Sequence, residues 1–142
     1  MDHIVYVEAA SKEMDRILAG SKKIILRGAM GRKLPYERVF KGDTLYFMNN
    51  NGEGLVKATA KVFNVVNTDK LSPDESMAML QVYSNDLQLS NAQLKRFGGK
   101  RYLVLIEIIK PKKIKPIKTD KSNFANMDDW LFVEDINKVI VK

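Results

Sequence analysis

The sequence predicts an α+β domain built around a small β-barrel, with mixed, mainly antiparallel strands and two or three short flanking helices. Three observations lead to this prediction. Short runs of β-branched and aromatic residues alternate with polar turns. Two helix starts with matching capping residues fall between the later runs. One nearly uninterrupted apolar run follows them, as expected for a strand covered on both faces.

The first third of the chain predicts a strand, a helix and a second strand. The run His3–Glu8 is rich in β-forming residues. A short helix follows, with Ser11 as its N-cap and Gly20 as its C-terminal stop. Residues 22–27 form the next predicted strand, and residues 28–43 form a loop because they contain glycines, a proline and a Gly-Asp turn.

A hairpin is predicted next. Thr44–Met48 is a strong strand, and Asn49–Gly54 is the turn because Asn-Gly tolerates positive φ. Leu55–Val66 returns as a long strand in which small apolar residues alternate with polar ones. The residues expected on its inner face are Val56, Ala58, Ala60 and Val62.

Two capped helices and a buried strand complete the predicted core. Ser72 with Glu75, and Ser90 with Gln93, have the spacing of capping boxes, and Gly98-Gly99 ends the second helix. Arg101–Ile109 is almost wholly apolar and is expected to be central. Beyond it, prolines exclude a regular helix and favour an extended chain. Residues 128–142 are expected to add one amphipathic element or a final strand pair.

Length and composition restrict the class of protein. The 142 residues predict a single domain spanning 1–142, and 45% hydrophobic with 29% charged residues is typical of a soluble globular protein. No apolar run approaches the roughly 20 residues of a membrane span, and no secretory signal precedes the first strand. We therefore expect a cytoplasmic protein that does not bind a membrane. Its oligomeric state stays open.

The residue composition does not support a catalytic thiol or a common type of metal site. The chain contains no cysteine, which excludes disulfides, thiolate nucleophiles and cysteine-based zinc sites. Its one histidine, His3, is interpreted as structural. The adjacent carboxylates Asp128 and Asp129 are interpreted as a turn or a helix start. We expect neither a metal nor a cofactor.

Positive charge is concentrated in two blocks. The net charge is +7, and residues 91–118 contain nine Lys or Arg and one acid, which gives this segment +8. Residues 20–36 contain five cations and no acid. Charge gathered in this way predicts a basic face for a polyanion. Lys95 and Arg96 have another explanation, because cations near a helix C-terminus stabilise its dipole.

The first block carries a family resemblance. Its segment Gly-x-Lys-x-x-x-x-Arg, a following Gly-Asp turn and a strand with small residues resemble the ASCH branch of the PUA-like superfamily. The resemblance covers roughly Ile4–Lys118 and extends to small archaeal PUA-like proteins. The positions that carry it are Gly20, Lys22, Arg27, Gly42, Asp43, Ala58 and Ala60.

The resemblance implies a pseudo-barrel with a cleft beside the Gly-x-Lys segment, in a superfamily whose members bind RNA and in part read modified bases. One ASCH branch resembles an amidohydrolase that acts on acetylated cytidine, and its lysine and arginine correspond to Lys22 and Arg27. The polar residue between them is replaced by Ile25, which can neither attack a carbonyl nor transfer a proton.

RNA binding is therefore the favoured function, and a hydrolase acting on a modified nucleoside is the alternative. An enzyme would use Lys22 and would need Thr59, Glu75 or Asp43 to reach it. A module that binds an acidic protein is a third hypothesis. The predicted RNA contacts are Lys22, Lys23, Arg27, Arg32, Lys33, Lys100, Arg101, Lys112, Lys113 and Lys115.

Two aromatic residues are candidates for stacking on bases. Base stacking on an aromatic side chain contributes about 1–3 kcal/mol per base. Trp130 and Tyr46 both lie in apolar segments, however, and an aromatic residue in such a segment is more often part of the core. We therefore interpret both as core residues.

Overall fold

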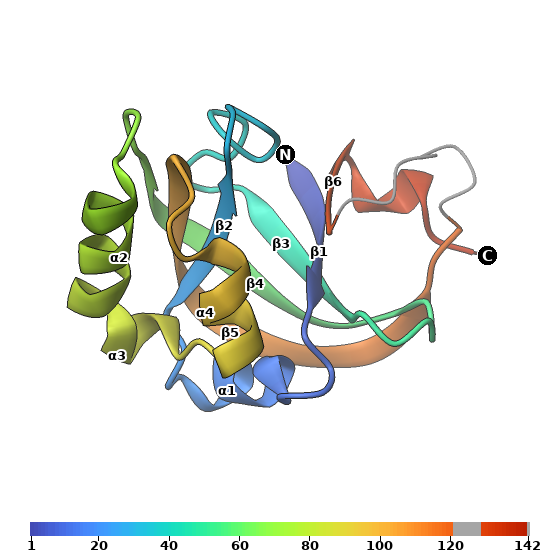
Figure 1. Cartoon of the computed structure of the whole chain (residues 1–142). Helices are drawn as coiled ribbons and strands as arrows, with labels where there is room; N and C mark the ends of the chain where they lie inside the picture. Colours follow the sequence, from blue (N-terminus) through green and yellow to red (C-terminus); the bar gives the residue numbers. More distant parts are fainter. Residues whose placement is uncertain (121–128, 142) are drawn as a thin grey trace.

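The computed structural model describes residues 1–120 and 129–141 and is dominated by one six-stranded sheet that curls into a half-barrel (Figure 1). The strand order across the sheet is β2-β5-β4-β3-β1-β6. The strands are β1 (Asp2–Val7), β2 (Ile24–Ala29), β3 (Thr44–Asn49), β4 (Leu55–Asn67), β5 (Tyr102–Lys118) and β6 (Trp130–Glu134). The helices are α1 (Glu13–Ala19), α2 (Pro73–Val82), α3 (Ser84–Leu87), α4 (Asn91–Phe97) and the 3₁₀ turn η1 (Ile136–Lys138).

This architecture confirms the predicted α+β class with a mixed, mainly antiparallel sheet. Strands β1 and β3 are parallel, and the other neighbouring pairs are antiparallel. The two capping boxes are both formed, at the starts of α2 and α4. None of the helices in the described ranges has the length and apolar character that a membrane crossing requires.

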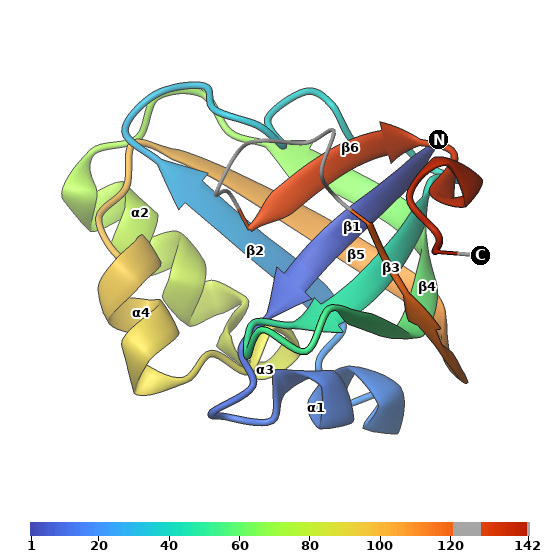
Figure 2. The same ribbon diagram turned by 90° about the vertical axis from the view of Figure 1, so that its right-hand side faces the viewer.

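The first half of β5, from Leu103 to Ile106, is buried on both faces, as its apolar sequence predicts. On one face, Leu103 and Leu105 pack with residues of α2, α3 and α4. On the other face, Val104 and Ile106 belong to the main core, which also contains the inner residues Ala58, Ala60 and Val62 of β4. Helices α2, α3 and α4 thus cover one side of the sheet, whereas Met14 and Ile17 of α1 pack into the main core on the other side. In Figure 2, α2 and α4 lie together and α1 lies apart from them.

Three local predictions need correction or completion. Helix α1 has Lys12 as its N-cap, without a side-chain hydrogen bond, so Ser11 is not the cap. Its predicted C-terminal stop is confirmed, because Gly20 adopts φ 83°, a value that favours glycine. The extended conformation predicted for the proline-containing segment is confirmed, and the segment belongs to β5, which continues through it to Lys118. The last segment forms β6 and η1, and Asp128 lies outside the described residues.

A buried polar chain joins β6 to the rest of the sheet. The indole Nε1 of Trp130 donates to Nδ1 of His3 at 3.1 Å, and Nε2 of His3 lies 2.9 Å from Oδ2 of Asp43. An indole nitrogen can only donate, so Nδ1 accepts and the proton of neutral His3 sits on Nε2. Burial lowers the pKa of His3, although Asp43 opposes this effect. His3 and Trp130 are therefore structural, as the sequence indicated.

Candidate nucleic-acid interface

A small pocket lies where the two ends of the curled sheet approach each other. Nη2 of Arg27, on β2, donates to the carbonyl oxygen of Tyr6 on β1 at 2.6 Å. The backbone N–H of Tyr6 in turn donates to the carbonyl oxygen of Asp129, just before β6, at 3.0 Å. The cavity has a volume of about 50 Å³. Its polar and aromatic lining residues are Arg27, Lys33, Tyr36, Arg96, Phe97, Tyr102 and Asp129.

Arg27 is held rigidly on one wall of this pocket. Its side chain is only 6% exposed, and Nη1 donates to the carbonyl oxygen of Leu26 at 2.8 Å. The guanidinium also lies 5.6 Å from the ring centroid of Trp130, within the range of a cation–π contact. Both Nη atoms are thus bonded to carbonyl oxygens, and Nε, which is also buried, is the remaining nitrogen.

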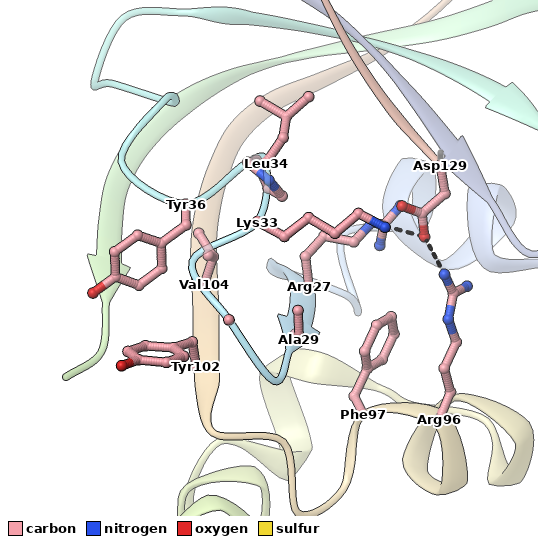
Figure 3. A pocket seen from close by; sticks show the side chains of 13 residues that line it. Arg27, Ala29, Lys33, Leu34, Tyr36, Arg96, Phe97, Tyr102, Val104 and Asp129 are labelled. Carbon is pink, nitrogen blue, oxygen red and sulfur yellow. Dashed lines mark ion pairs between the residues drawn. The ribbon is translucent and has the colours of Figure 1, made fainter. Parts of the chain in front are cut away.

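One carboxylate bridges two arginines across the pocket (Figure 3). Oδ2 of Asp129 lies 3.3 Å from Nε of Arg27 and 2.9 Å from Nη2 of Arg96, which comes from α4. Lys33 extends from its loop toward the same carboxylate (Figure 3). Among the residues that the structure describes, the lining holds three cationic side chains and one carboxylate, an excess of two positive charges. Such an excess attracts anions.

Aromatic rings form the side of the pocket toward the loop between β2 and β3. Tyr36 and Tyr102 meet edge to face with ring centroids 5.6 Å apart. The hydroxyl of Tyr36 donates to the carbonyl oxygen of Thr68, which fixes the ring. The guanidinium of Arg32 lies 5.8 Å from the Tyr36 ring and 5.6 Å from the Tyr102 ring. An exposed arginine on two tyrosine rings is a surface on which a base or a phosphate can bind.

Lys22 is not part of this pocket. Its side chain is 1% exposed, its ammonium donates to the carbonyl oxygen of Leu87, and Nζ lies 3.5 Å from Oε2 of Glu13. Burial lowers the pKa of Lys22 to about 8, against the opposing effect of Glu13. The predicted role of Lys22 as an RNA contact does not fit this position, because its charge is enclosed and already paired.

In the described residues, the surroundings of Lys22 differ from those expected for the hydrolase alternative, which is therefore not favoured. The carboxylate beside Lys22 is Glu13, and not one of the three residues expected there from the sequence. Oε1 of Glu13 accepts hydrogen bonds from the backbone N–H of Glu8 at 2.7 Å and from Nε2 of Gln93 at 2.8 Å. Ile25 is fully buried in the main core. This cluster ties α1, α4 and the segment before β2 together.

The other predicted RNA contacts lie in different parts of the surface: near the pocket, on the far half of β5 and, for Lys23, at the opposite end of β2. Lys33 lines the pocket, and Arg32 lies beside it. Lys100 lies near Gly28 on the side of Leu103, and neither Lys100 nor Arg101 lines the pocket. The lysines of the far half of β5 lie ten or more residues beyond Tyr102, or about 30 Å along a strand. These are Lys112, Lys113 and Lys115, all exposed. Lys23 is exposed at the opposite end of β2 from the pocket.

Comparison with solved structures identifies the fold. A crystal structure of a mutant of the ASCH protein from Zymomonas mobilis superimposes with a TM-score of 0.68 over 96% of this chain and 93% of that chain, at 15% identity. The structure described as ASCH from the same organism gives 0.66 over 93% of this chain and 87% of that chain, at 17% identity. The chain has the fold of an ASCH domain. No family model and no curated protein matches its sequence.

Reasoning from the sequence does not find three residues of this pocket. The sequence explains Arg96 by the helix dipole, Asp129 by a turn or helix start and Tyr102 by a strand. Each local assignment is compatible with the structure, since Arg96 lies in the last turn of α4 and Tyr102 begins β5. The signal for a site in the sequence is the surplus of cations in both basic blocks. This surplus indicates a charged surface, but it does not indicate that Asp129 pairs with an arginine from each block.

Proposed function

We propose that this ASCH-like chain binds RNA, with the pocket at the sheet seam as the principal contact site. The observation that carries the proposal is the net positive pocket between Arg27, Lys33 and Arg96, in a fold of the PUA-like superfamily. Arginine and lysine side chains supply affinity by neutralising phosphates, and the guanidinium of Arg32, which lies over the two tyrosine rings, offers a flat surface on which an unpaired base can stack.

The lysine tract of β5 is a second, weaker contact in this proposal. Lysines are flexible point charges, so the tract would neutralise backbone phosphates without reading sequence. Its separation from the pocket along β5 means that only an RNA long enough to follow the sheet reaches both. Short oligonucleotides would report on the pocket alone, and longer ones on both surfaces.

Fluorescence anisotropy with short and long labelled RNAs, at two salt concentrations, tests the proposal. The variant Arg32→Ala/Lys33→Ala removes two exposed cations at the pocket, and Lys112→Ala/Lys115→Ala removes two from the tract as a charge-matched control. We expect the pocket variant to weaken binding of short RNA and the tract variant to leave it nearly unchanged. The dependence of log affinity on log salt should have a slope of about −0.7 per phosphate neutralised.

Three results would contradict this assignment. Binding that survives the pocket variant and fails in the tract variant would move the site to β5. Equal binding of RNA and of an acidic peptide of the same charge would favour a protein partner. Absence of RNA binding, together with a thermal shift by a modified nucleoside, would favour a nucleoside ligand.

A further inference from the structure

The buried guanidinium of Arg27 has one nitrogen whose hydrogen-bonding capacity is unused. Among the described residues, Nε of Arg27 is buried and has no hydrogen-bond partner, although Asp129 lies at ion-pair distance. Both Nη atoms donate to neutral carbonyl oxygens, which do not balance a buried charge. A buried cation is stable when an anion with suitable geometry meets it. Arg27 therefore presents an N–H group to the pocket that suits an oxyanion.

The carboxylate of Asp129 neutralises the charge of Arg27 only in part. Oδ2 is shared between Arg27 and Arg96, and the shorter of the two contacts, at 2.9 Å, goes to Arg96. Within the described part of the chain, a single carboxylate oxygen thus serves two guanidinium groups. A phosphate group carries more charge and more acceptor oxygens, and arginine binds phosphate in a planar, two-pronged geometry. The pocket is thus better matched to a phosphate than to the acid it contains.

The size of the cavity limits what can enter it. About 50 Å³ suits one small polar group and is far below the roughly 300–1,000 Å³ of pockets that enclose a whole small molecule. Arg27 forms the buried end of the cavity, so a chemical group that enters the cavity cannot extend beyond Arg27. A phosphodiester inside an RNA continues in two directions, whereas a terminal phosphate monoester continues in one.

From these observations we infer that the pocket is a subsite for a terminal phosphate of RNA, and that the side chain of Asp129 is an internal competitor for the same position. The inference rests on the proposed function, because it names the part of the RNA that the pocket takes. Oxygens of the phosphate replace Oδ2 of Asp129 on Nε of Arg27 and Nη2 of Arg96. The nucleoside next to the phosphate remains outside, beside the tyrosines.

Competition between Asp129 and the phosphate predicts that a variant without the Asp129 charge binds RNA more tightly than the wild type. Removing the negative charge of Asp129 breaks a native ion pair and yet strengthens RNA binding. Because one competing charged contact is removed, binding of a phosphorylated end should become tighter by about tenfold or more. The backbone carbonyl of Asp129, which accepts from Tyr6, is unaffected by a change of side chain.

The test uses one short RNA in three forms: with a 5′-phosphate, with a 3′-phosphate and with hydroxyls at both ends. Anisotropy titrations compare the wild-type protein with Asp129→Asn, and with Asp69→Asn as a control that removes an exposed acid outside the pocket lining. We expect one phosphorylated form to bind more tightly than the hydroxyl form. Asp129→Asn should raise that preference about tenfold, and Asp69→Asn should not. The two phosphorylated forms show which end of the RNA enters.

A second measurement covers the case in which Asp129→Asn does not fold. Inorganic phosphate should raise the melting temperature of the wild-type protein more than sodium chloride of equal ionic strength. The exposed variant Arg96→Gln, whose side chain is 62% exposed in the native protein, should lose this effect. Arg96 stands on the rim of the pocket, so its replacement leaves the core intact.

The outcomes separate this inference from the proposed function. Equal binding of all three RNA forms, lost in Arg32→Ala/Lys33→Ala, would overturn the phosphate subsite and leave RNA binding intact. Stabilisation by phosphate through Arg96, without binding of any RNA, would support the subsite and refute RNA as its source. Neither a phosphate preference nor stabilisation by phosphate would overturn the inference completely.

Discussion

In the wild-type protein, Lys22 should make the free energy of unfolding rise with pH in the alkaline range. Replacing Lys22 by methionine should remove this rise. Burial lowers the pKa of Lys22 from 10.5 to about 8 in the folded protein. Below about pH 8, folded and unfolded chains both hold the proton, and the folded chain bears the desolvation cost of the ammonium. Between about pH 8 and 10.5 the unfolded chain binds more protons, so the free energy of unfolding rises with pH.

The size of this effect follows from the shift. One pKa unit corresponds to about 1.4 kcal/mol, so lowering the pKa from 10.5 to about 8 corresponds to about 3 kcal/mol. This is the rise in stability that the deprotonation of Lys22 should add between about pH 8 and 10.5. Lys22→Met lacks it. At neutral pH the variant should instead be less stable by about 3 kcal/mol, because Glu13 is left as a buried charge without its partner.

Urea denaturation followed by circular dichroism, at pH values from about 7 to 10, measures both effects. The comparison of wild type with Lys22→Met removes contributions from other groups that titrate in the same range. Lys23→Met is the matched control, since the neighbouring lysine is exposed. A difference between wild type and Lys22→Met that stays constant with pH would refute the reasoning. Addition of Glu13→Gln should recover much of the stability lost at neutral pH.

Three further predictions concern single residues. Burial lowers the pKa of His3 below 6.5, so stability should fall as the pH drops below about 6.5, and NMR of this one histidine should show a titration shifted to lower pH. Trp130→Phe removes the indole donor to His3 and should cost about 1–3 kcal/mol in urea denaturation. Gly98→Ala should cost about 1–3 kcal/mol, because its Cβ would lie 2.7 Å from a backbone carbonyl, whereas Gly31→Ala meets no atom within 4 Å and should be tolerated.

Much of the fold could be predicted because its determinants are local. The alternation of Val56, Ala58 and Ala60 gives the buried face of β4 directly, and the spacing of Ser72 and Glu75 gives the start of α2. The continuation of β5 beyond Ile109 was not predicted as a strand. Its lysines and prolines resemble a loop, but pairing with β4 provides partners that local sequence does not show.

The candidate site could be predicted only in part, because it depends on closure of the sheet. Arg27 and Asp129 are separated by about a hundred residues and meet only when β1 and β6 lie beside the end of β2. The sequence displays the charge of Lys22 but not its enclosure by Glu13 and the carbonyl oxygen of Leu87. Charge patterns therefore identified the basic character of the region, and tertiary contacts decided which cations reach a ligand.

The position of β1 between β3 and β6 has a consequence for synthesis on the ribosome. One edge of β1 can pair once β3 has emerged, but the other edge has to wait for Trp130–Glu134. At roughly 5–20 residues per second, this wait lasts about 6–25 s. During that time the nascent chain carries an apolar strand with an open edge, which is a site for aggregation. Because Asp129 arrives with β6, the pocket also forms last.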